Sequence, residues 1–86
     1  MLNLAEAKLG EKFIVQSVHE HILKSQLMEL GIVSGQEVTV LFHAPFGDPI
    51  AIDMNGYVLS LRKSEAALIE VQRCESTAIG SGETNF

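Results

Sequence analysis

The chain has 86 residues, 47% of them hydrophobic, and carries a formal net charge of −5. Its length and apolar content predict one small domain with a compact core and exclude a chain that is disordered throughout. The acidic balance, with only six Lys and Arg residues, argues against nucleic acid or an anionic membrane surface as a partner.

Cysteine content and hydropathy indicate the cellular compartment in which the protein works. Cys74 is the only cysteine, so the chain can form no intramolecular disulfide and no cysteine-based zinc site. The first residues include an early acid and no long apolar run, unlike a secretory signal. No segment approaches the about 20 apolar residues of a membrane-spanning helix. We therefore expect a cytoplasmic protein.

The first predicted elements are a capped turn and a strand. Asn3 can cap the turn, with Glu6 reaching back as in a capping box. The side chains expected to face inward there are Leu4, Ala7 and Leu9. Residues 13–18 have strand composition, but their alternation allows either face to be inside. We prefer the face with Ile14 and Val18, which places Gln16 at an edge, over the face with Phe13 and Val15.

A helix is predicted over residues 20–30, because the apolar spacing changes there to the helical period. Its apolar side chains are Leu23, Leu27, Met28 and Leu30, and its polar ones are Lys24, Ser25, Gln26 and Glu29. Gly31 and Ile32 predict a Schellman ending, with Ile32 against Leu27. A turn over residues 33–36 with Gly35 at positive φ follows. Residues 37–43 then form a strand with Val38, Val40 and Phe42 on one face.

Asn55-Gly56 is the strongest short signal in the chain, because a type I′ hairpin turn needs positive φ at both central residues. A two-residue turn sets the register of the flanking strands. The predicted pairs are Met54 with Tyr57, Asp53 with Val58, Ile52 with Leu59, Ala51 with Ser60 and Ile50 with Leu61. The first, third and fifth pairs form an apolar face, which must be covered by further elements.

The chain closes with a short turn, a strand and a polar tail. Ser64 can cap a turn over residues 65–67, and residues 68–72 form the last strand. We predict a domain over residues 1–73 and a disordered polar tail over residues 74–86. Because closing a sheet of short strands removes unpaired edges, the predicted fold is mainly β: a small five-stranded SH3-like barrel with one inserted α-helix.

Three segments carry a family signal: Leu27-Met28-Glu29-Leu30-Gly31-Ile32-Val33-Ser34-Gly35, Ala44-Pro45-Phe46-Gly47-Asp48-Pro49 and Leu59-Ser60-Leu61-Arg62-Lys63-Ser64-Glu65-Ala66. In this order and spacing they resemble the FeoA family of bacterial ferrous iron transport, over the range 4–71. The resemblance implies an SH3-like barrel that acts in the cytoplasm beside FeoB, a membrane transporter with a G-protein domain. It also implies a binding role without catalysis.

The function hypothesis taken from this resemblance is a cytosolic accessory protein that binds FeoB and modulates its assembly or GTP-driven activity. Two departures from the family pattern stand out. Of the basic residues that members often carry on the helix before Leu-x-x-Leu-Gly, only Lys24 remains, which weakens or changes any basic contact of that helix with FeoB. Ser34 stands where many members have proline, which loosens the turn there without changing its type.

The predicted partner-binding residues are Lys24, Pro45, Phe46, Gly47, Asp48 and Arg62. Phe46 lies between Pro45 and Gly47, where it is either an exposed anchor for a partner or a lid folded onto the core. The hairpin register places Asp48 opposite Lys63 and diagonal to Arg62, close enough for an ion pair. Asp48 can also bond backbone amides of the 45–49 loop, and either contact gives it a structural role, which we prefer to a role in binding. Lys24 is expected near Phe46, on the helix.

Other classes of function have weaker support. His19 and His21 share a side if their strand continues, which gives the alternative of a metal-responsive sensor or adaptor. No further ligand has a recognised spacing to them, so we expect no metal and no cofactor. No nucleophile, base and acid are suggestively spaced, and we expect no enzyme. A third alternative is a structural protein that self-assembles, as a weak homo-oligomer, through the edge of its last strand.

Overall fold

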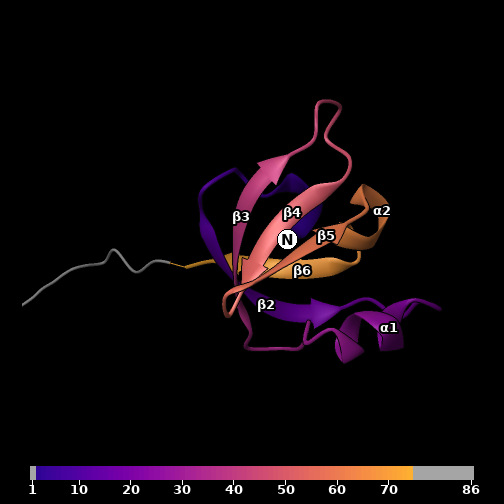
Figure 1. The fold of residues 1–86 in the computed structure, drawn as a ribbon. Coiled ribbons are helices and arrows are strands. Elements are labelled where there is room, and N and C mark those ends of the chain that lie inside the picture. Colours follow the sequence, from indigo (N-terminus) through magenta and orange to yellow (C-terminus); the bar gives the residue numbers. More distant parts are fainter. Residues whose placement is uncertain (1, 75–86) are drawn as a thin grey trace, which may run out of the picture.

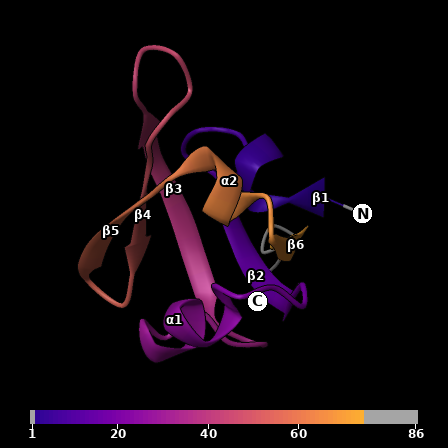
Figure 2. The same ribbon diagram turned by 90° about the vertical axis from the view of Figure 1, so that its right-hand side faces the viewer.

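The computed structural model describes residues 2–74, in which six strands form one antiparallel sheet. The strands are β1 (Leu2–Asn3), β2 (Lys12–Val18), β3 (Glu37–His43), β4 (Ile50–Met54), β5 (Tyr57–Leu61) and β6 (Ile69–Arg73). They lie in the order β1-β6-β2-β3-β4-β5. The sheet curls around a core, as Figures 1 and 2 show, but β1 and β5 at its ends do not pair with each other.

Three short helices complete the described residues: the 3₁₀ helix η1 (Leu4–Glu6), α1 (Lys24–Glu29) and α2 (Lys63–Ala66). Helix α1 lies at one end of the molecule, and the loop between β3 and β4 projects from the opposite end (Figures 1 and 2). No helix in residues 2–74 is long and apolar enough to cross a bilayer.

The expected architecture needs four corrections. The sheet has six strands rather than five, because Leu2–Asn3 forms a short strand beside β6. It is open rather than closed, since no pairing joins its two ends. The last strand, β6, lies between β1 and β2 and is therefore not the end of the sheet that the self-assembly alternative assumed. The inserted helix is also shorter than predicted, and the predicted tail lies outside the described residues apart from Cys74.

The β4–β5 hairpin has the predicted register throughout, from Met54 opposite Tyr57 to Ile50 opposite Leu61. Asn55 has φ 56° and Gly56 has φ 86°, the positive values that a type I′ turn requires. One part of the prediction is wrong: Tyr57 is 72% exposed, although it lies on the apolar face of the hairpin. The core covers β4 and the part of β5 away from the turn, where Leu61 is buried and Leu59 packs against the core.

Two β-bulges change which side chains the long strands bury. In β2 the register shifts between Val15 and Ser17, so Phe13, Val15 and Val18 are all buried. The preference for Ile14 as an inward residue is therefore wrong. The extra residue in the bulge moves the alternation by one position after Val15, so Val18 shares a face with Phe13 and Val15 rather than with Ile14. In β3 a shift between Val40 and Phe42 has the same effect, and Phe42 is 54% exposed instead of inward.

Helix α1 ends as predicted. The N–H of Gly31 donates to Met28 O (3.0 Å) and the N–H of Ile32 donates to Leu27 O (3.1 Å), which are the two bonds of a Schellman motif. Gly31 has φ 100°, and both Leu27 and Ile32 are buried. Gly35 has the expected positive φ, 94°. The predicted apolar stripe of the helix is only partly buried, since Met28 and Leu30 are about half exposed.

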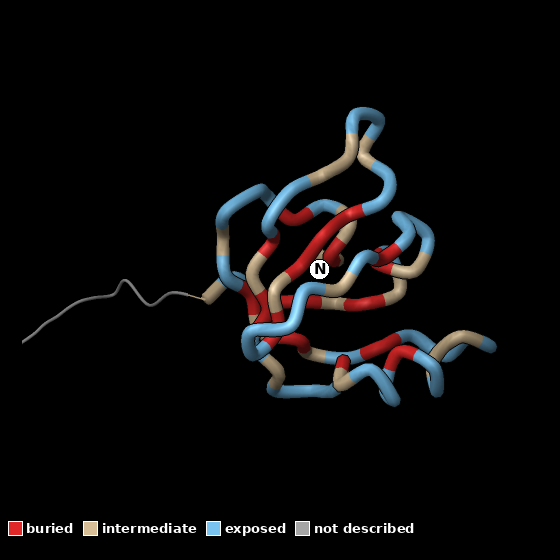
Figure 3. Tube along the Cα trace, viewed as in Figure 1, coloured by how far each residue is buried: buried red, intermediate tan, exposed pale blue. Residues whose placement is uncertain are grey.

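Of the remaining local predictions, one is confirmed and two are wrong. The Asn3–Glu6 capping box is confirmed, with both bonds at 3.2 Å. Leu9 is 59% exposed, so its inward placement is wrong. Ser64 does not cap α2; the Glu65 carboxylate instead accepts a hydrogen bond from the Arg62 N–H (2.8 Å). Figure 3 shows that the buried residues are concentrated in the packed body of the molecule and that the projecting β3–β4 loop is exposed at its tip.

Candidate partner-binding surfaces

The β3–β4 loop is a compact turn that presents one aromatic side chain. The N–H of Gly47 donates to Ala44 O (2.7 Å), which closes a β-turn with Pro45 at its second position. The N–H of Ala44 donates to Pro49 O (2.9 Å), which joins the two ends of the loop. Phe46 is 94% exposed at the tip. The interpretation of Phe46 as a lid on the core is therefore wrong, and its side chain is free to meet a partner.

Asp48 ties this loop to the start of α2. Its Oδ1 accepts a hydrogen bond from the backbone N–H of Lys63 (3.0 Å), the residue predicted to lie opposite it. No ion pair joins Asp48 to Arg62 or Lys63 within residues 2–74, so the expected ion pair is replaced by a bond to a backbone amide. Asp48 and Arg62 nevertheless line one polar surface pocket, together with Pro49, Ser60 and Glu65.

Lys24 belongs to a different part of the molecule. It begins α1, at the end of the molecule opposite the β3–β4 loop (Figures 1 and 2), so the expectation that it lies near Phe46 is wrong. Its Nζ lies 2.8 Å from Glu20 Oε2. This hydrogen bond and the positive charge of Lys24 lower the pKa of the Glu20 carboxyl below its ordinary value. The six predicted residues thus do not form one site.

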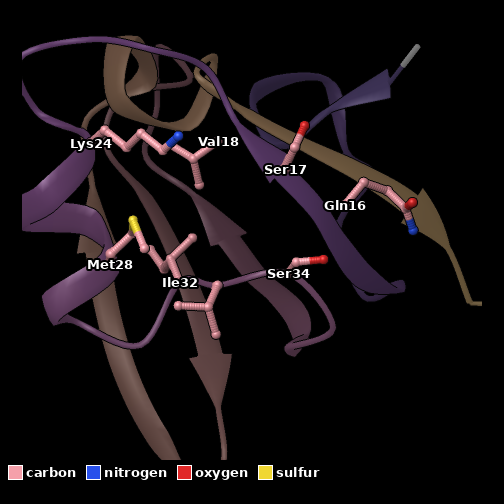
Figure 4. A pocket seen from close by; sticks show the side chains of 8 residues that line it. Gln16, Ser17, Val18, Lys24, Met28, Ile32 and Ser34 are labelled. Carbon is pink, nitrogen blue, oxygen red and sulfur yellow. The ribbon is translucent and has the colours of Figure 1, made fainter.

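A second surface, which the sequence did not indicate, is a pocket of about 240 Å³ between α1 and β2. Figure 4 shows side chains from both elements around it. Its lining residues are Gln16, Ser17, Val18, Lys24, Met28, Ile32, Val33 and Ser34. The pocket depends on the β2 bulge, which turns Val18 to the same side of the strand as the core residues, and a bulge has no clear sequence signal.

The two histidines proposed for a metal sensor have separate partners. Strand β2 ends at Val18, so the condition that would place both on one side of a strand is not met. His19 Nε2 lies 2.8 Å from Glu70 Oε2, and His21 Nδ1 accepts a hydrogen bond from the Leu23 N–H (3.1 Å). In the described part of the chain, no three His, Cys, Asp or Glu side chains are grouped so that they could hold a metal ion.

Comparison with known proteins identifies the family. The model of the FeoA domain matches residues 2–73. The chain belongs to the FeoA domain family. A curated relative from Porphyromonas gingivalis, named as a fusion of Fe(2+) transport protein A with the Fe(2+) transporter FeoB, is 32% identical over 85 residues. That match covers 98% of this chain but 10% of the relative, so the chain spans about a tenth of the fusion protein's length.

Solved FeoA structures have the same fold. The FeoA-like protein of Clostridium acetobutylicum is 36% identical, with a TM-score of 0.81 over 92% of this chain and 93% of its own. The FeoA of Stenotrophomonas maltophilia, solved with zinc and described as an SH3 domain protein, is 31% identical, with a TM-score of 0.75 over 84% of this chain and 91% of its own. The fold of this FeoA-family chain is therefore SH3-like, with its sheet left open.

Proposed function

We propose that this FeoA-family chain is an accessory protein of ferrous iron transport that binds a FeoB-type transporter on its cytoplasmic side and modulates the transporter's assembly or GTP-driven activity. The observation that carries the proposal is the Porphyromonas gingivalis fusion, in which a region similar to nearly all of this chain is named together with FeoB in one polypeptide. Fusion holds two modules at a high effective concentration, which favours a contact that separate chains must form by collision.

The docking surface that we propose is the tip of the β3–β4 loop, with Phe46 as its anchor and Pro45 and Gly47 beside it. An aromatic side chain has only two rotatable bonds, so burying it in a partner costs little conformational entropy. The loop is held by its two backbone bonds and by the Asp48 bond to α2, so little backbone order has to be gained on binding. Both features suit an interface hot spot.

Arg62 adds an exposed positive charge beside this surface. It is exposed, lines the same pocket as Asp48 at the base of the loop, and makes no ion pair within the described residues. A positive charge at the rim of an interface mainly accelerates association and makes it dependent on salt. Lys24 is not part of this surface, because it lies at the other end of the molecule and pairs with Glu20.

The test is a calorimetric titration of this protein into the purified FeoB transporter of the same cell, with and without ferrous iron. We expect saturable binding that is weakened at least tenfold by Phe46→Ala. The matched control is Phe42→Ala, which removes another exposed phenylalanine, from β3 rather than from the loop. Absence of binding at tens-of-micromolar concentrations, about −6 kcal/mol, would contradict direct pairwise docking.

The same titration distinguishes the two surfaces. Met28→Ser changes the rim of the α1–β2 pocket, where Met28 is 46% exposed. If binding is lost in Met28→Ser and kept in Phe46→Ala, the chain docks on FeoB through the α1 end and the loop assignment is wrong. If both single variants bind like the wild type, neither surface is the principal contact.

The second candidate, a metal-responsive sensor, is favoured by the zinc complex of the Stenotrophomonas maltophilia relative and by the close approach of His19 to Glu70. A neutral imidazole and a carboxylate are both ligands for zinc and for ferrous iron. Replacing His19 and His21 together by alanine removes a metal dependence of FeoB binding under this hypothesis. Under the docking proposal the double variant binds as the wild type does, with and without metal.

A further inference from the structure

Strand β5 is the unprotected edge of the sheet. The other end of the sheet is β1, which has only two residues, whereas β5 has five and pairs with β4 alone. In a hairpin with a two-residue turn, Met54 and Tyr57 exchange backbone hydrogen bonds with each other, so the N–H and C=O groups of Val58 and Ser60 point away from β4. No backbone partner for these groups occurs within residues 2–74 outside the sheet pairings.

The side chains of β5 do not block pairing. Natural edge strands are usually protected by a lysine, a proline, a bulge or extreme shortness. The β5 sequence, Tyr-Val-Leu-Ser-Leu, contains no charge and no proline, and its register against β4 is continuous. Tyr57 is 72% and Val58 is 63% exposed. An uncharged, regular and partly apolar edge is therefore presented by a chain whose net charge is −5.

We propose that β5 pairs antiparallel with β5 of a second copy of this chain, about a two-fold axis at Leu59. In this register Val58 of each copy lies opposite Ser60 of the other, and their outward N–H and C=O groups satisfy one another. Leu59 lies opposite its own counterpart, and Tyr57 opposite Leu61. The two sheets become one continuous sheet with no unpaired strand longer than β1.

A second copy suits this edge because β5 carries no charge. An antiparallel copy of β5 centred on Leu59 gives a contact with two-fold symmetry and brings no charged side chains of the two strands together. On the inner face, the rows of Tyr57, Leu59 and Leu61 meet as apolar pairs, which covers the Tyr57 ring. On the outer face, Val58 meets Ser60. No charged residue of β5 opposes its copy, so the repulsion of two acidic chains acts only at a distance and is screened by salt.

The size of the contact predicts a weak association. Two five-residue edges bury much less than the about 1,200 Å² of a stable interface. We therefore expect a dimer that forms at high micromolar to millimolar concentration and is strengthened by salt. The inference does not rest on FeoB binding and uses no residue of the β3–β4 loop, although Ser60 lines the same pocket as Asp48 and Arg62.

Disulfide trapping tests the register. In a Cys74→Ser background, Leu59→Cys places two thiols on the axis, where the Cα atoms of a non-hydrogen-bonded pair are about 4.5 Å apart, within the range for a disulfide. The matched control, Val58→Cys, places its thiols on diagonal positions about 7–8 Å apart, beyond that range. We expect a covalent dimer in glutathione buffer from Leu59→Cys and at least tenfold less from Val58→Cys. Equal yields from the two variants would overturn the register.

Sedimentation equilibrium of the unmodified chain supplies a test without an introduced thiol. We expect the average mass to rise with concentration, and the rise to be lost in Ser60→Pro, which removes an outward N–H without breaking the β4–β5 ladder. Ser60→Ala keeps the backbone group and should associate as the wild type does. A wild-type chain that remains monomeric at millimolar concentration and high salt would overturn the proposal, as would association that survives Ser60→Pro in a folded variant.

Discussion

Gly31→Ala probes the junction between the end of α1 and the β4–β5 hairpin. Gly31 has φ +100°, and a Cβ built there would lie 3.2 Å from Met54 Cε. Two costs therefore add. An L-residue held at positive φ costs about 1–2 kcal/mol. Moving the end of the Met54 side chain out of its preferred rotamer costs about 0.5–1.5 kcal/mol more.

Gly35→Ala separates these two costs. Gly35 has φ +94°, close to that of Gly31, but a Cβ there meets nothing within 4 Å. We expect Gly35→Ala to lose only the backbone part, about 1–2 kcal/mol. Urea unfolding monitored by circular dichroism measures both variants, and thermal unfolding should show a drop of about 4–8 °C for each kcal/mol lost.

A double-mutant cycle with Met54→Ala isolates the contact. In that background Gly31→Ala should cost no more than Gly35→Ala does in the wild type, because the side chain that the new methyl group meets is gone. An equal loss for Gly31→Ala with and without Met54 would refute the contact. A loss below about 0.5 kcal/mol for both glycine variants would refute the backbone reasoning.

Three further predictions test single contacts. Phe13→Ala should lower the free energy of unfolding, measured in urea, by about 3–5 kcal/mol, because the ring is fully buried. Ile14→Ala, on the other face of β2, should lower it by about 1 kcal/mol. Equal losses would contradict the assigned faces of β2. Asp48→Ala should cost about 1 kcal/mol, since it leaves a backbone amide of α2 without its carboxylate, and an unchanged stability would mean that water replaces the bond. Lys24→Ala should raise the pKa of Glu20 toward its ordinary value in an NMR titration. Because the folded pKa is lowered, the stabilisation from this pair is present above the unfolded carboxyl's pKa and is lost as pH falls through the folded one.

The hairpin and the helix ending were predictable because their signals are local. Asn55-Gly56 can adopt positive φ at two successive residues, and a two-residue turn then leaves one register for β4 and β5. Gly31 followed by an apolar residue likewise predicts the two hydrogen bonds that end α1. In both cases the residue types restrict the backbone directly, without help from distant parts of the chain.

The faces of β2 and β3 were not predictable from alternation. A bulge adds one residue to a strand and so moves every later side chain to the other face. The bulges lie at Gln16 and Leu41, and neither residue type is a sequence signal for a bulge. Phe42 was therefore expected inside and is exposed, while Ile14 was preferred over Phe13, which is the buried residue. Bulges of this kind follow from the curvature of the whole sheet.

The candidate site was predictable in part. Asp48 was correctly expected close to Lys63, because the hairpin register can be counted outward, but its bond to the backbone rather than to a side chain depends on the start of α2. Phe46 could be placed in a loop, but not as exposed or covered. The separation of Lys24 from that loop is a property of the tertiary arrangement, which no spacing along the chain encodes.

The central claim is that the β3–β4 loop docks on FeoB, and NMR of the ¹⁵N-labelled chain tests it most directly. Unlabelled, detergent-solubilised FeoB is added, and the loss of each amide signal is followed along the chain. The account predicts the largest early losses at Phe46, Gly47 and their neighbours in the loop. Uniformly retained signals would contradict binding, and losses centred on α1 or on β5 would contradict the assignment of the docking surface to the loop.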